Sequence, residues 1–483
     1  MGYTQKVVII GGGVSGLACA YRLRQLGIPC LVLEAEARPG GVIATARRDG
    51  YLFELGPQCP RFPAPVWQLV QELRLKEEFV AGDPAAKRYI YRYGKLHPAP
   101  FSPGGLLTTR LVSWSSKLRV LTEALRSTQP PMEEETLAEL VTRKFGADLV
   151  DNLADPIIST IFFADAYKMG MQSAFPALVE WERNHGSLVR GAIRARNAKG
   201  NKVASNGTSA SVKGKLNPKS MKVTDSLPSL GSFRSGMARL PERLAEELGV
   251  DIRYGVRVKN VAPIGVGWQI ALEDGEKITT DQIVLAVPAY EAASMLDHAT
   301  PELARELQGI EYAPMGGVAS GYDRRQVQNN LDGFGFMVPR KEGSKTICTF
   351  WNSSLFPERA PRDKVLITSF VRSEATEIGA IDDTFARGIE AENAAILGIA
   401  GAPAARRVWR QSRALPQYNV GHSKRVEAIQ QILPAVPRLH LAGNYLRGRS
   451  IGDCVELALQ VAEKVHSQLA ERDIQPVNRS SEG

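Results

Sequence analysis

The chain has 483 residues, 44% of them hydrophobic, and a formal net charge of +9 from 60 basic and 51 acidic side chains. That length is enough for two to three domains with sizeable hydrophobic cores. No apolar run approaches the roughly 18 residues of a membrane-spanning helix, and the first apolar strand runs into a glycine turn, unlike a secretory signal, so we expect a cytoplasmic protein.

The first apolar strand, residues 7–10, leads directly into a glycine turn and then into a helix. In such a turn Gly11 permits the tight bend, Gly13 lets the backbone approach a pyrophosphate, and Gly16 lets the helix pack closely on the strand. The free N–H groups and the positive dipole end of the helix then face the phosphates. The residues predicted to bind a dinucleotide here are Gly11, Gly12, Gly13, Val14, Ser15 and Gly16.

A second apolar strand, residues 30–33, ends at Glu34, whose carboxylate can accept hydrogen bonds from the ribose of an adenosine. Arg38, Gly40 and Gly41 follow closely. This strand–Glu–x3–Arg–x–Gly–Gly arrangement resembles the amine oxidase, desaturase and porphyrinogen oxidase superfamily of FAD proteins, in which the glycine pair brings backbone close to the flavin diphosphate. The resemblance implies that the bound dinucleotide is FAD.

The middle of the chain alternates between helical and extended patterns. The expected elements are a helix over 65–79, a hairpin over 88–96, mainly helices over 106–195, a helix over 235–248 and antiparallel strands over 333–373. Thr136 and Glu139 have the spacing of a capping box, which predicts the start of a helix between them.

Positive charge is concentrated in one segment. Between residues 188 and 224 there are nine Lys or Arg and no Asp or Glu, which equals the whole net charge of the chain. The composition over 197–231 predicts a disordered basic loop. This loop is either a solvated insertion or a contact for anionic lipid on the inner face of the cell membrane. Nucleic acid is disfavoured as a partner, because no aromatic residues alternate with the charges.

The C-terminal part of the chain is expected to complete the FAD site. Residues 278–286 are predicted to form a return strand, and residues 438–442 a strand that ends at Gly443 and Asn444. A helix beginning near Ile451 directs a second N-terminus at the flavin ring, where reduction develops negative charge. Segments more than 400 residues apart thus build one site, so insertions interrupt the FAD domain.

Several segments resemble the protoporphyrinogen oxidases and their sister group, the coproporphyrinogen oxidases. These segments are residues 83–89, 93–100, 175–187, 333–339, 353–361 and 415–422. The resemblance runs from residue 7 to about residue 465, apart from the basic loop. It implies a flavoenzyme that oxidises a porphyrinogen in late haem or chlorophyll biosynthesis.

The resemblance also implies roles for individual residues. Arg88 matches an arginine that holds a substrate propionate, and Met337 and Ile347 match two apolar positions that clasp the tetrapyrrole. Thr160 and Ala164 replace family glycines near the substrate edge, which leaves the pocket shape and turnover open. Other flavin-lining positions are matched by Ala35, Val42, Gly56, Pro57, Gln58 (where the family often has Asn), Cys59, Val258, Trp409, Arg449, Ser450 and Ile451.

The resemblance implies that a porphyrinogen methylene gives a hydride to the flavin and that repetition removes six electrons in total. No side chain is expected to act as a catalytic acid or base, because the cofactor carries the chemistry. Oxygen, or alternatively a quinone, would reoxidise the cofactor. Since Arg88 is the one matched propionate ligand, protoporphyrinogen IX, with two propionates, is favoured over coproporphyrinogen III, with four. A tetrapyrrole carrier that holds FAD without turnover is the alternative of another class.

The expected architecture is a Rossmann-like α/β FAD-binding domain with an inserted α+β substrate domain and a helical, membrane-associating domain. Expected boundaries are 1–64, 232–296 and 405–470 for the FAD domain, 65–100 and 297–404 for the substrate domain, 101–196 for the helical domain, 197–231 for the basic loop and 471–483 for a disordered tail. Five cysteines without a CxxC pair predict reduced thiols, and six histidines without ligand spacing predict no metal site. The sequence leaves a homodimer open.

Overall fold

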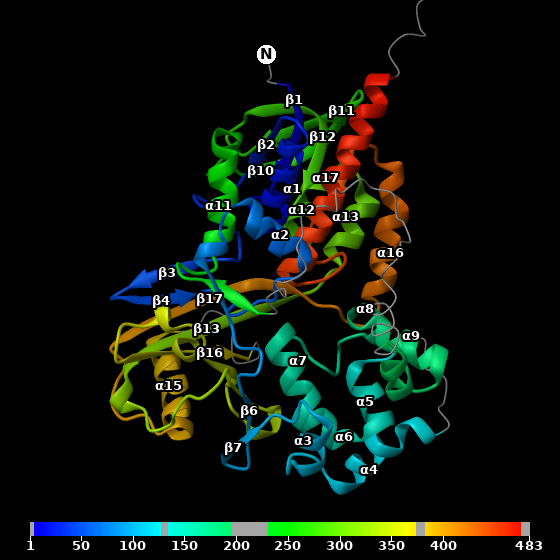
Figure 1. The fold of residues 1–483 in the computed structure, drawn as a ribbon. Helices are drawn as coiled ribbons and strands as arrows, with labels where there is room; N and C mark the ends of the chain where they lie inside the picture. The colour runs from blue at the N-terminus through cyan, green and yellow to red at the C-terminus, as the bar shows by residue number, and fades with distance from the viewer. Residues whose placement is uncertain (1–3, 127–133, 196–229, 373–381, 475–483) are drawn as a thin grey trace, which may run out of the picture.

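A computed structural model describes residues 4–126, 134–195, 230–372 and 382–474. Within them the chain builds two seven-stranded sheets and a helical unit (Figure 1). The first sheet lies at one end of the molecule, and the second sheet and the helical unit lie at the other. Residues 196–229, which hold almost all of the predicted basic loop, lie outside the described part of the chain.

The first sheet has the strand order β10–β11–β12–β1–β2–β9, with β18 also paired to β12. Its parallel strands are β1 (Thr4–Ile10), β2 (Cys30–Leu33), β9 (Ile252–Arg253), β12 (Lys277–Leu285) and β18 (Leu439–Leu441). An antiparallel edge consists of β10 (Val258–Ile264) and β11 (Gly267–Leu272). The central strands are continuous apolar runs because both faces of the sheet are buried.

Helices cover both faces of the first sheet. In β1, Val7 and Ile9 point to one face and Val8 and Ile10 to the other, as the two-residue period of a strand requires. The first face packs against α1 (Val14–Gln25), α2 (Ala64–Glu72), α11 (Arg239–Leu248) and α17 (Ile451–Ile474). The second face packs against α12 (Ala289–Leu296), α13 (Pro301–Gln308) and α16 (His422–Ile432).

The second sheet has the strand order β17–β13–β16–β15–β14–β6–β7. Its strands are β6 (Arg88–Arg92), β7 (Lys95–Pro98), β13 (Tyr312–Asp323), β14 (Gly335–Met337), β15 (Thr346–Trp351), β16 (Lys364–Val371) and β17 (Ala405–Pro416). The predicted hairpin is confirmed as β6–β7, and β14, β15 and β16 are antiparallel as predicted. The pairing of β14 with β6 is parallel, so the sheet is mixed. Helix α15 (Asp383–Leu397) packs against β13 and β16.

Several elements differ from their predicted bounds or unit. α2 ends at Glu72 instead of residue 79, and both α2 and α13 pack on the first sheet instead of joining the substrate domain. β17, predicted within the FAD domain, is an edge strand of the second sheet. α11 begins at Arg239, later than residue 235, and α17 extends to Ile474, into the predicted disordered tail. Periodicity specifies that an element has an apolar face, but not which sheet that face covers.

The helical unit extends over residues 103–195 and is mainly helical, as predicted, and its helices are short. The main ones are α3 (Pro103–Thr108), α4 (Trp114–Thr122), α5 (Leu137–Phe145), α7 (Asp155–Phe162) and α9 (Pro176–His185). The predicted capping box is confirmed at the start of α5, where Thr136 and Glu139 bond each other's backbone N–H groups. Among the described residues, no helix has both the length and the apolar character needed to span a bilayer.

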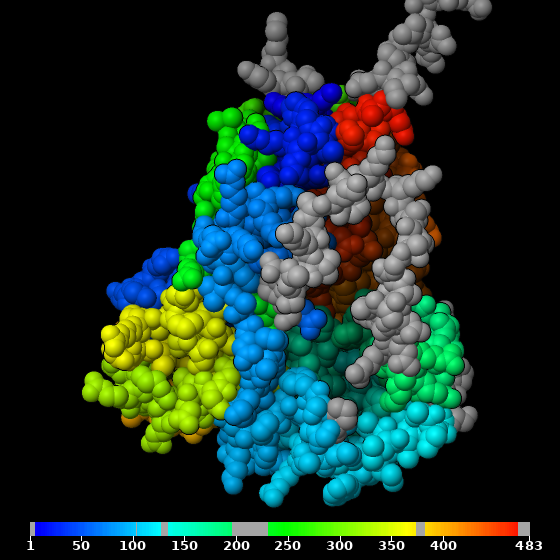
Figure 2. All heavy atoms as spheres, viewed as in Figure 1, coloured from blue at the N-terminus to red at the C-terminus, as the bar shows by residue number. Residues whose placement is uncertain are grey.

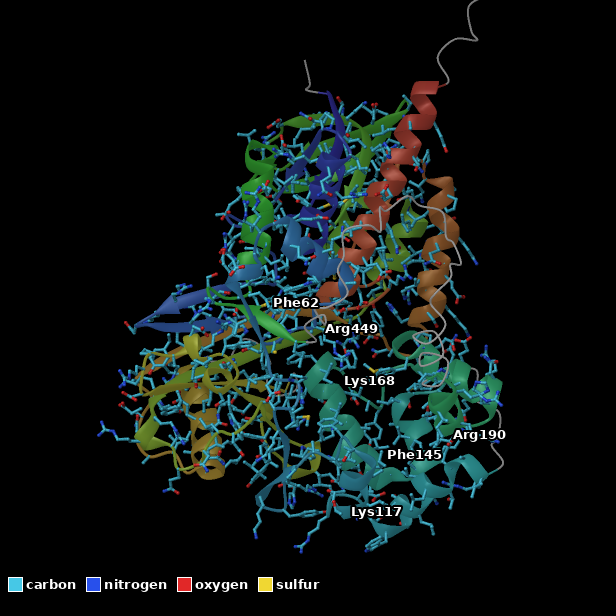
Figure 3. The ribbon with its side chains drawn as sticks, in the orientation of Figure 1. Phe62, Lys117, Phe145, Lys168, Arg190 and Arg449 are labelled. Atoms are coloured by element: carbon cyan, nitrogen blue, oxygen red, sulfur yellow. The ribbon has the colours of Figure 1, made fainter. Side chains whose placement is uncertain are left out.

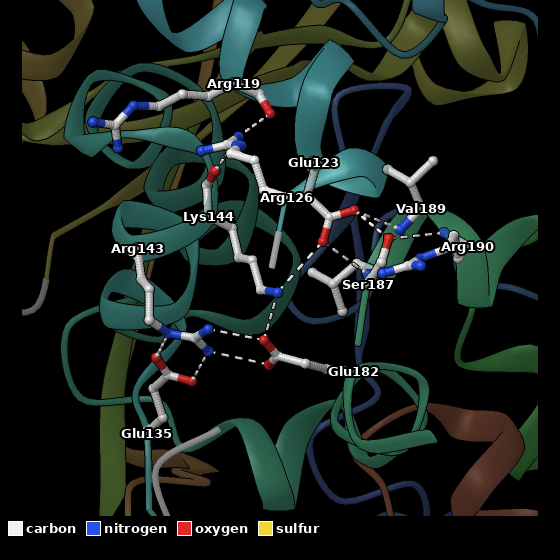
Figure 4. Close-up of polar contacts among 11 residues, drawn as sticks. Arg119, Glu123, Arg126, Glu135, Arg143, Lys144, Glu182, Ser187, Val189 and Arg190 are labelled. Atoms are coloured by element: carbon white, nitrogen blue, oxygen red, sulfur yellow. Dashed lines mark hydrogen bonds and ion pairs between the residues drawn. The ribbon is translucent and has the colours of Figure 1, made fainter. Parts of the chain in front are cut away.

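A buried ion network holds the helical unit together (Figure 4). Lys144 Nζ lies 2.6 Å from Glu182 Oε1, and the guanidinium of Arg143 contacts Glu182 at 2.8 Å and Glu135 at 2.7 Å. Burial by itself raises the pKa of Glu182, but the hydrogen bonds from Arg143 and Lys144 outweigh it and lower the pKa. The carboxylate therefore stays ionised and cross-links α5 to α9.

Glu123 extends this network to residues 188–195, the last described helical segment of the helical unit. Its carboxylate lies 3.4 Å from Lys144 Nζ and accepts a hydrogen bond from the Ser187 hydroxyl at 2.5 Å. It also accepts from the backbone N–H groups of Leu188 at 3.0 Å and Val189 at 3.2 Å. Glu123 thus satisfies the free donors at the start of that helix.

A second buried ion pair joins the two sheets' domains. Arg359, in the connection between β15 and β16, lies 3.0 Å from Glu54 at the end of β4 (Tyr51–Glu54), and both side chains are 1% exposed. Arg359 also donates to the Ser232 hydroxyl at 2.5 Å, and Glu54 accepts from the Met237 N–H at 2.9 Å. Burial raises the pKa of Glu54, and the neighbouring guanidinium opposes that rise.

Removing Arg359 is expected to destabilise the protein strongly. Arg359→Met leaves the Glu54 carboxylate buried without its cation, and breaking such a pair costs about 3–5 kcal/mol of unfolding free energy. The control Arg362→Met removes an exposed guanidinium from the same connection and is expected to change stability by less than about 0.5 kcal/mol. Urea denaturation of both variants measures the difference, and equal midpoints would contradict the prediction.

Candidate active site

The strands β1, β12 and β18 end at the same edge of the first sheet, where the glycine turn begins α1. Gly11 has φ +110°, a conformation that other residues rarely adopt, and its N–H donates to Leu33 O at 2.8 Å. A Cβ on Gly16 would lie 1.9 Å from Gly11 O, whereas a Cβ on Gly13 would meet no atom within 4 Å. Gly16 therefore serves packing, and Gly13 leaves open space in front of the N-terminus of α1.

The predicted glycine pair and the predicted acid both touch this turn. Gly40 N–H donates to Gly12 O at 2.8 Å, and Gly40 also forms a bridge with Gly13. Glu34 is buried at the end of β2, and its Oε2 accepts from Gly12 N–H at 2.5 Å. Its other oxygen accepts from Glu36 N–H at 2.8 Å. The sheet edge thus places a carboxylate beside the glycine turn, as adenosine binding requires.

The remaining predicted residues near the turn differ in how far they are buried. Arg38 is exposed and its guanidinium donates to Gly41 O at 2.8 Å, so it closes its own loop. Val42 is exposed and Ala35 is partly buried. Val258 is buried at the start of β10. It lies two residues after Val256, whose N–H donates to the Glu34 carbonyl.

Residues 56–59 connect this domain to the second sheet. Gln58 is buried, and its amide donates to the carbonyls of Glu54 at 3.0 Å and Gly56 at 2.9 Å. Its side-chain oxygen accepts from Asn352 Nδ2 at 2.6 Å. Gln58, which departs from the family's usual Asn, therefore acts as a structural link, while Pro57 and Cys59 beside it are partly buried.

The N-terminus of α17 meets that of α1. Ser450 forms a capping box with Asp453, donating to Asp453 Oδ2 at 2.6 Å and accepting from its N–H at 3.1 Å. One turn further on, burial raises the pKa of the Cys454 thiol to about 11, while a hydrogen bond with Ser15 of α1 lowers it. Two positive helix ends therefore converge at the sheet edge, an arrangement that favours an anion such as a pyrophosphate.

The loop between β18 and α17 passes Gly443 and Asn444 and brings Arg449 to the boundary between the first-sheet domain and the helical unit (Figure 3). The guanidinium of Arg449 lies over the rings of Phe162, at 4.6 Å, and Tyr418, at 4.7 Å. Its Nη1 donates to the carbonyls of Phe162 and Pro416, both at 3.3 Å. Burial lowers the pKa of Arg449 to about 10, and Tyr418 opposes that shift. The sequence did not indicate these aromatic neighbours.

The predicted substrate residues lie on neighbouring strands of the second sheet. Met337 on β14 pairs with Ile90 on β6, and both pack with Ile347 on β15 in one buried cluster. Arg88, two residues before Ile90, shares its face of β6. The guanidinium of Arg88 stacks on Phe334 at 4.1 Å and forms no ion pair among the described residues. Burial lowers the pKa of Arg88.

The two residues that replace family glycines pack in different clusters. Thr160 on α7 lies beside the Cys348 thiol of β15, next to the Met337 cluster. Ala164 instead packs in the core of the helical unit. Between them Phe163 has φ +49°, rare for a bulky residue, and its ring lies 4.9 Å from that of Phe370. Sequence reasoning missed Phe163, because its neighbours come from a distant strand.

The family model described as flavin-containing amine oxidoreductase matches residues 14–466. The chain belongs to that family. The predicted resemblance to porphyrinogen oxidases is confirmed by a protoporphyrinogen oxidase of Oryza sativa subsp. japonica, 31% identical over 96% of this chain and 88% of the relative. A coproporphyrinogen III oxidase of Bacillus subtilis is 27% identical over 94% of this chain and 96% of the relative.

Solved structures agree on the fold. A protein from Exiguobacterium has a TM-score of 0.79 at 24% identity, covering 96% of this chain and 99% of the other. A reduced UDP-galactopyranose mutase has a TM-score of 0.71 at 16% identity, covering 96% of each chain. The predicted FAD-binding α/β fold is therefore confirmed, with mixed sheets.

As a member of the amine oxidoreductase family, the chain is an FAD-dependent oxidoreductase. Its residues fit FAD: the space at Gly13 admits a pyrophosphate, and Trp409 Nε1 on β17 is buried without a partner among the described residues. No group of His, Cys, Asp or Glu in the described ranges has the geometry of a metal site. The five cysteines are free, four of them buried.

Valine substitutions at two glycines are expected to separate FAD binding from folding. Gly13 has φ −72°, which valine tolerates, so Gly13→Val should fold normally but lose FAD because its side chain fills the phosphate space. Gly16→Val should fail to fold, because its Cβ collides with the Gly11 carbonyl. Flavin absorbance per chain and far-UV circular dichroism report the two effects. A folded Gly13→Val protein with its full complement of FAD would contradict the prediction.

Proposed function

We propose that this flavoenzyme oxidises protoporphyrinogen IX to protoporphyrin IX in late haem or chlorophyll biosynthesis. The reaction removes six electrons and six protons, and three molecules of oxygen accept them to form three of hydrogen peroxide; a quinone is the alternative acceptor. Similarity to a plant protoporphyrinogen oxidase over 96% of the chain supports the reaction. The main support for a substrate of this class comes from Arg88. It is a half-buried cation beside an apolar cluster, and it has no ion-pair partner among the described residues.

Arg88 is proposed to bind a propionate of the substrate. A guanidinium can donate two parallel hydrogen bonds to a carboxylate, and here one of its nitrogens is used by the Ala86 carbonyl at 3.2 Å. The ring of Phe334 supports the guanidinium from one side, so its plane is held fixed. A partly desolvated cation of this kind gains more from an anionic ligand than an exposed one would.

The apolar cluster beside Arg88 is proposed to hold the tetrapyrrole. Met337 and Ile347 contribute flexible and branched surface from adjacent strands, and Thr160 limits the space from the helical side. Bound FAD supplies the hydride acceptor. The side chains then have to bind and orient the substrate and exclude water, and we propose that none of them acts as an acid or base.

Coproporphyrinogen III is the second candidate substrate. It carries four propionates, so its pocket needs more cations than one. Burial is the main cause that lowers the pKa of Arg88, and the charge of nearby Arg61 lowers it further. Arg61 is therefore a candidate for a second cation that binds a propionate. The Bacillus subtilis relative named for this activity is similar over almost its full length.

The helical unit is proposed to dock on an anionic membrane. Trp114, Leu118, Leu121 and Leu125 recur at the spacing of one helix face and are 76%, 61%, 60% and 85% exposed. α4 lies at the end of the molecule opposite β1, and the first-sheet domain does not reach that end (Figures 1 and 2). An exposed apolar stripe of this kind is typical of interfacial membrane contact.

Arg88→Ala is expected to lower kcat/KM for protoporphyrinogen about 10- to 150-fold, because a hydrogen bond to a charged group contributes about 1.5–3 kcal/mol. FAD should stay bound. The control Lys87→Ala removes an exposed cation that pairs with Asp332 at 2.7 Å and should leave kcat/KM unchanged. Unequal rates with the two porphyrinogens identify the substrate.

Anaerobic reduction of the flavin tests the proposed reaction itself. Protoporphyrinogen added without oxygen should bleach the flavin absorbance of the unchanged protein. Faster bleaching by coproporphyrinogen would favour the second candidate substrate. If neither porphyrinogen bleaches the flavin, although the porphyrin binds, the protein is a carrier and the proposed reaction is wrong.

Leu118→Glu combined with Leu125→Glu is expected to lower binding to vesicles of mixed neutral and anionic lipid at least about tenfold, since burying one leucine contributes about 1.5–3 kcal/mol. The matched control Val250→Glu with Val266→Glu adds the same charges to exposed residues of the first-sheet domain. Cosedimentation measures both. Rising salt should weaken any vesicle binding that the basic loop contributes, but not the binding that the leucines contribute. Equal binding of both double variants would contradict the docking surface.

A further inference from the structure

We infer that the guanidinium of Arg449 raises the reduction potential of the bound FAD by stabilising its reduced, negatively charged form. The inference rests on the proposed function only in that the cofactor must be reduced during turnover. Arg449 was predicted to line the flavin, but the sequence assigned it no role. Its lack of a described counter-charge, its place in the fold and the direction of its contacts support the effect on the flavin.

Arg449 is a cation without a counter-anion in the part of the chain that the structure describes. Among the described residues its guanidinium contacts two carbonyls, both through Nη1, and two aromatic faces. No carboxylate of the described residues forms an ion pair with it. Phe162 and Tyr418 hold the guanidinium plane in place, so the other nitrogens keep donors for a further partner. A partly buried guanidinium with spare donors favours an anion.

The fold places Arg449 at the end of the site opposite the adenosine position. Glu34 marks the adenosine end of the sheet edge, and the paired starts of α1 and α17 mark the pyrophosphate. Arg449 lies two residues before α17, where the loop from β18 reaches the helical unit and the end of β17. A dinucleotide held with its adenosine at Glu34 and its pyrophosphate at the two helix ends would have its second ring system on the side of Arg449.

The charges around Arg449 leave it free to act on that ring. Asp453 is the nearest acid along α17, and its carboxylate is bonded by the hydroxyl and N–H of Ser450. The phenol of Tyr418 donates to Asn444 O at 2.8 Å, and burial raises its pKa, so it stays neutral. The positive end of α17 adds to the field of the guanidinium.

The chemistry links this cation to one redox state. Accepting a hydride adds two electrons and one proton, so the neutral oxidised ring system gains one negative charge. A fixed cation stabilises that charge and has little effect on the oxidised state. Arg449 should therefore make FAD a better hydride acceptor without touching the substrate.

The test measures the two-electron potential of bound FAD by titration with dithionite against reference dyes, which requires no porphyrinogen. Arg449→Met removes the charge but keeps an unbranched chain between the two rings. It is expected to weaken binding of reduced relative to oxidised FAD at least tenfold, which corresponds to about 30 mV for two electrons. Arg449→Lys keeps the charge and should retain most of the potential.

The matched control is Arg447→Met, in the same loop. Arg447 is exposed and donates to Gln460 Oε1 at 2.9 Å, so removing its screened charge should leave the potential unchanged. If Arg449→Met does not retain FAD, Arg449→Gln, which can still donate to a carbonyl, carries the same test. An unchanged potential in the charge-removing variants overturns the inference, and a raised KM alone would show that Arg449 binds a substrate carboxylate instead. Failure of porphyrinogen to bleach the flavin would count against the proposed reaction and leave this result standing.

Discussion

The close approach of Gly16 to the carbonyl of Gly11 fixes how α1 leaves β1, and the rest of the site depends on that contact. A side chain at Gly16 would collide with the turn, so the helix can start directly at the sheet edge. This brings the open space at Gly13 in front of the N-terminus of α1. The same edge carries Glu34 at the end of β2 and the loop after β18. We therefore expect FAD to be bound by backbone geometry more than by side-chain chemistry.

The second organising feature is the boundary between the first-sheet domain and the rest of the molecule. The buried pair of Glu54 and Arg359 and the amide link between Gln58 and Asn352 connect the domains on one side. On the other side Arg449 inserts between Phe162 and Tyr418. These polar groups are costly to bury alone, so each one specifies how the domains must meet. We propose that the flavin and the substrate meet at this boundary, where Arg449 has no ion-pair partner among the described residues.

Much of this arrangement could be predicted because it is local in the sequence. The strand–glycine–helix turn, the acid at the end of the next strand, the hairpin of β6 and β7 and the capping box of α5 all depend on residues close together in the chain. The assignment of α2, α13 and β17 to the wrong units has the opposite cause. Each has a clear apolar face, but the partner of that face comes from a distant segment.

The sequence by itself determined the cofactor class, the main strands and helices, and the residues that resemble a porphyrinogen oxidase site. Short-range geometry and turn chemistry predict the dinucleotide turn and the main elements, and the resemblance to known families implies FAD and the substrate residues. Only the tertiary structure decided that Thr160 lies beside the Met337 cluster while Ala164 does not, and that no described carboxylate pairs with Arg449. Such contacts join segments hundreds of residues apart. Their partners are selected by packing and by the cost of leaving a buried charge unpaired, neither of which a linear pattern contains.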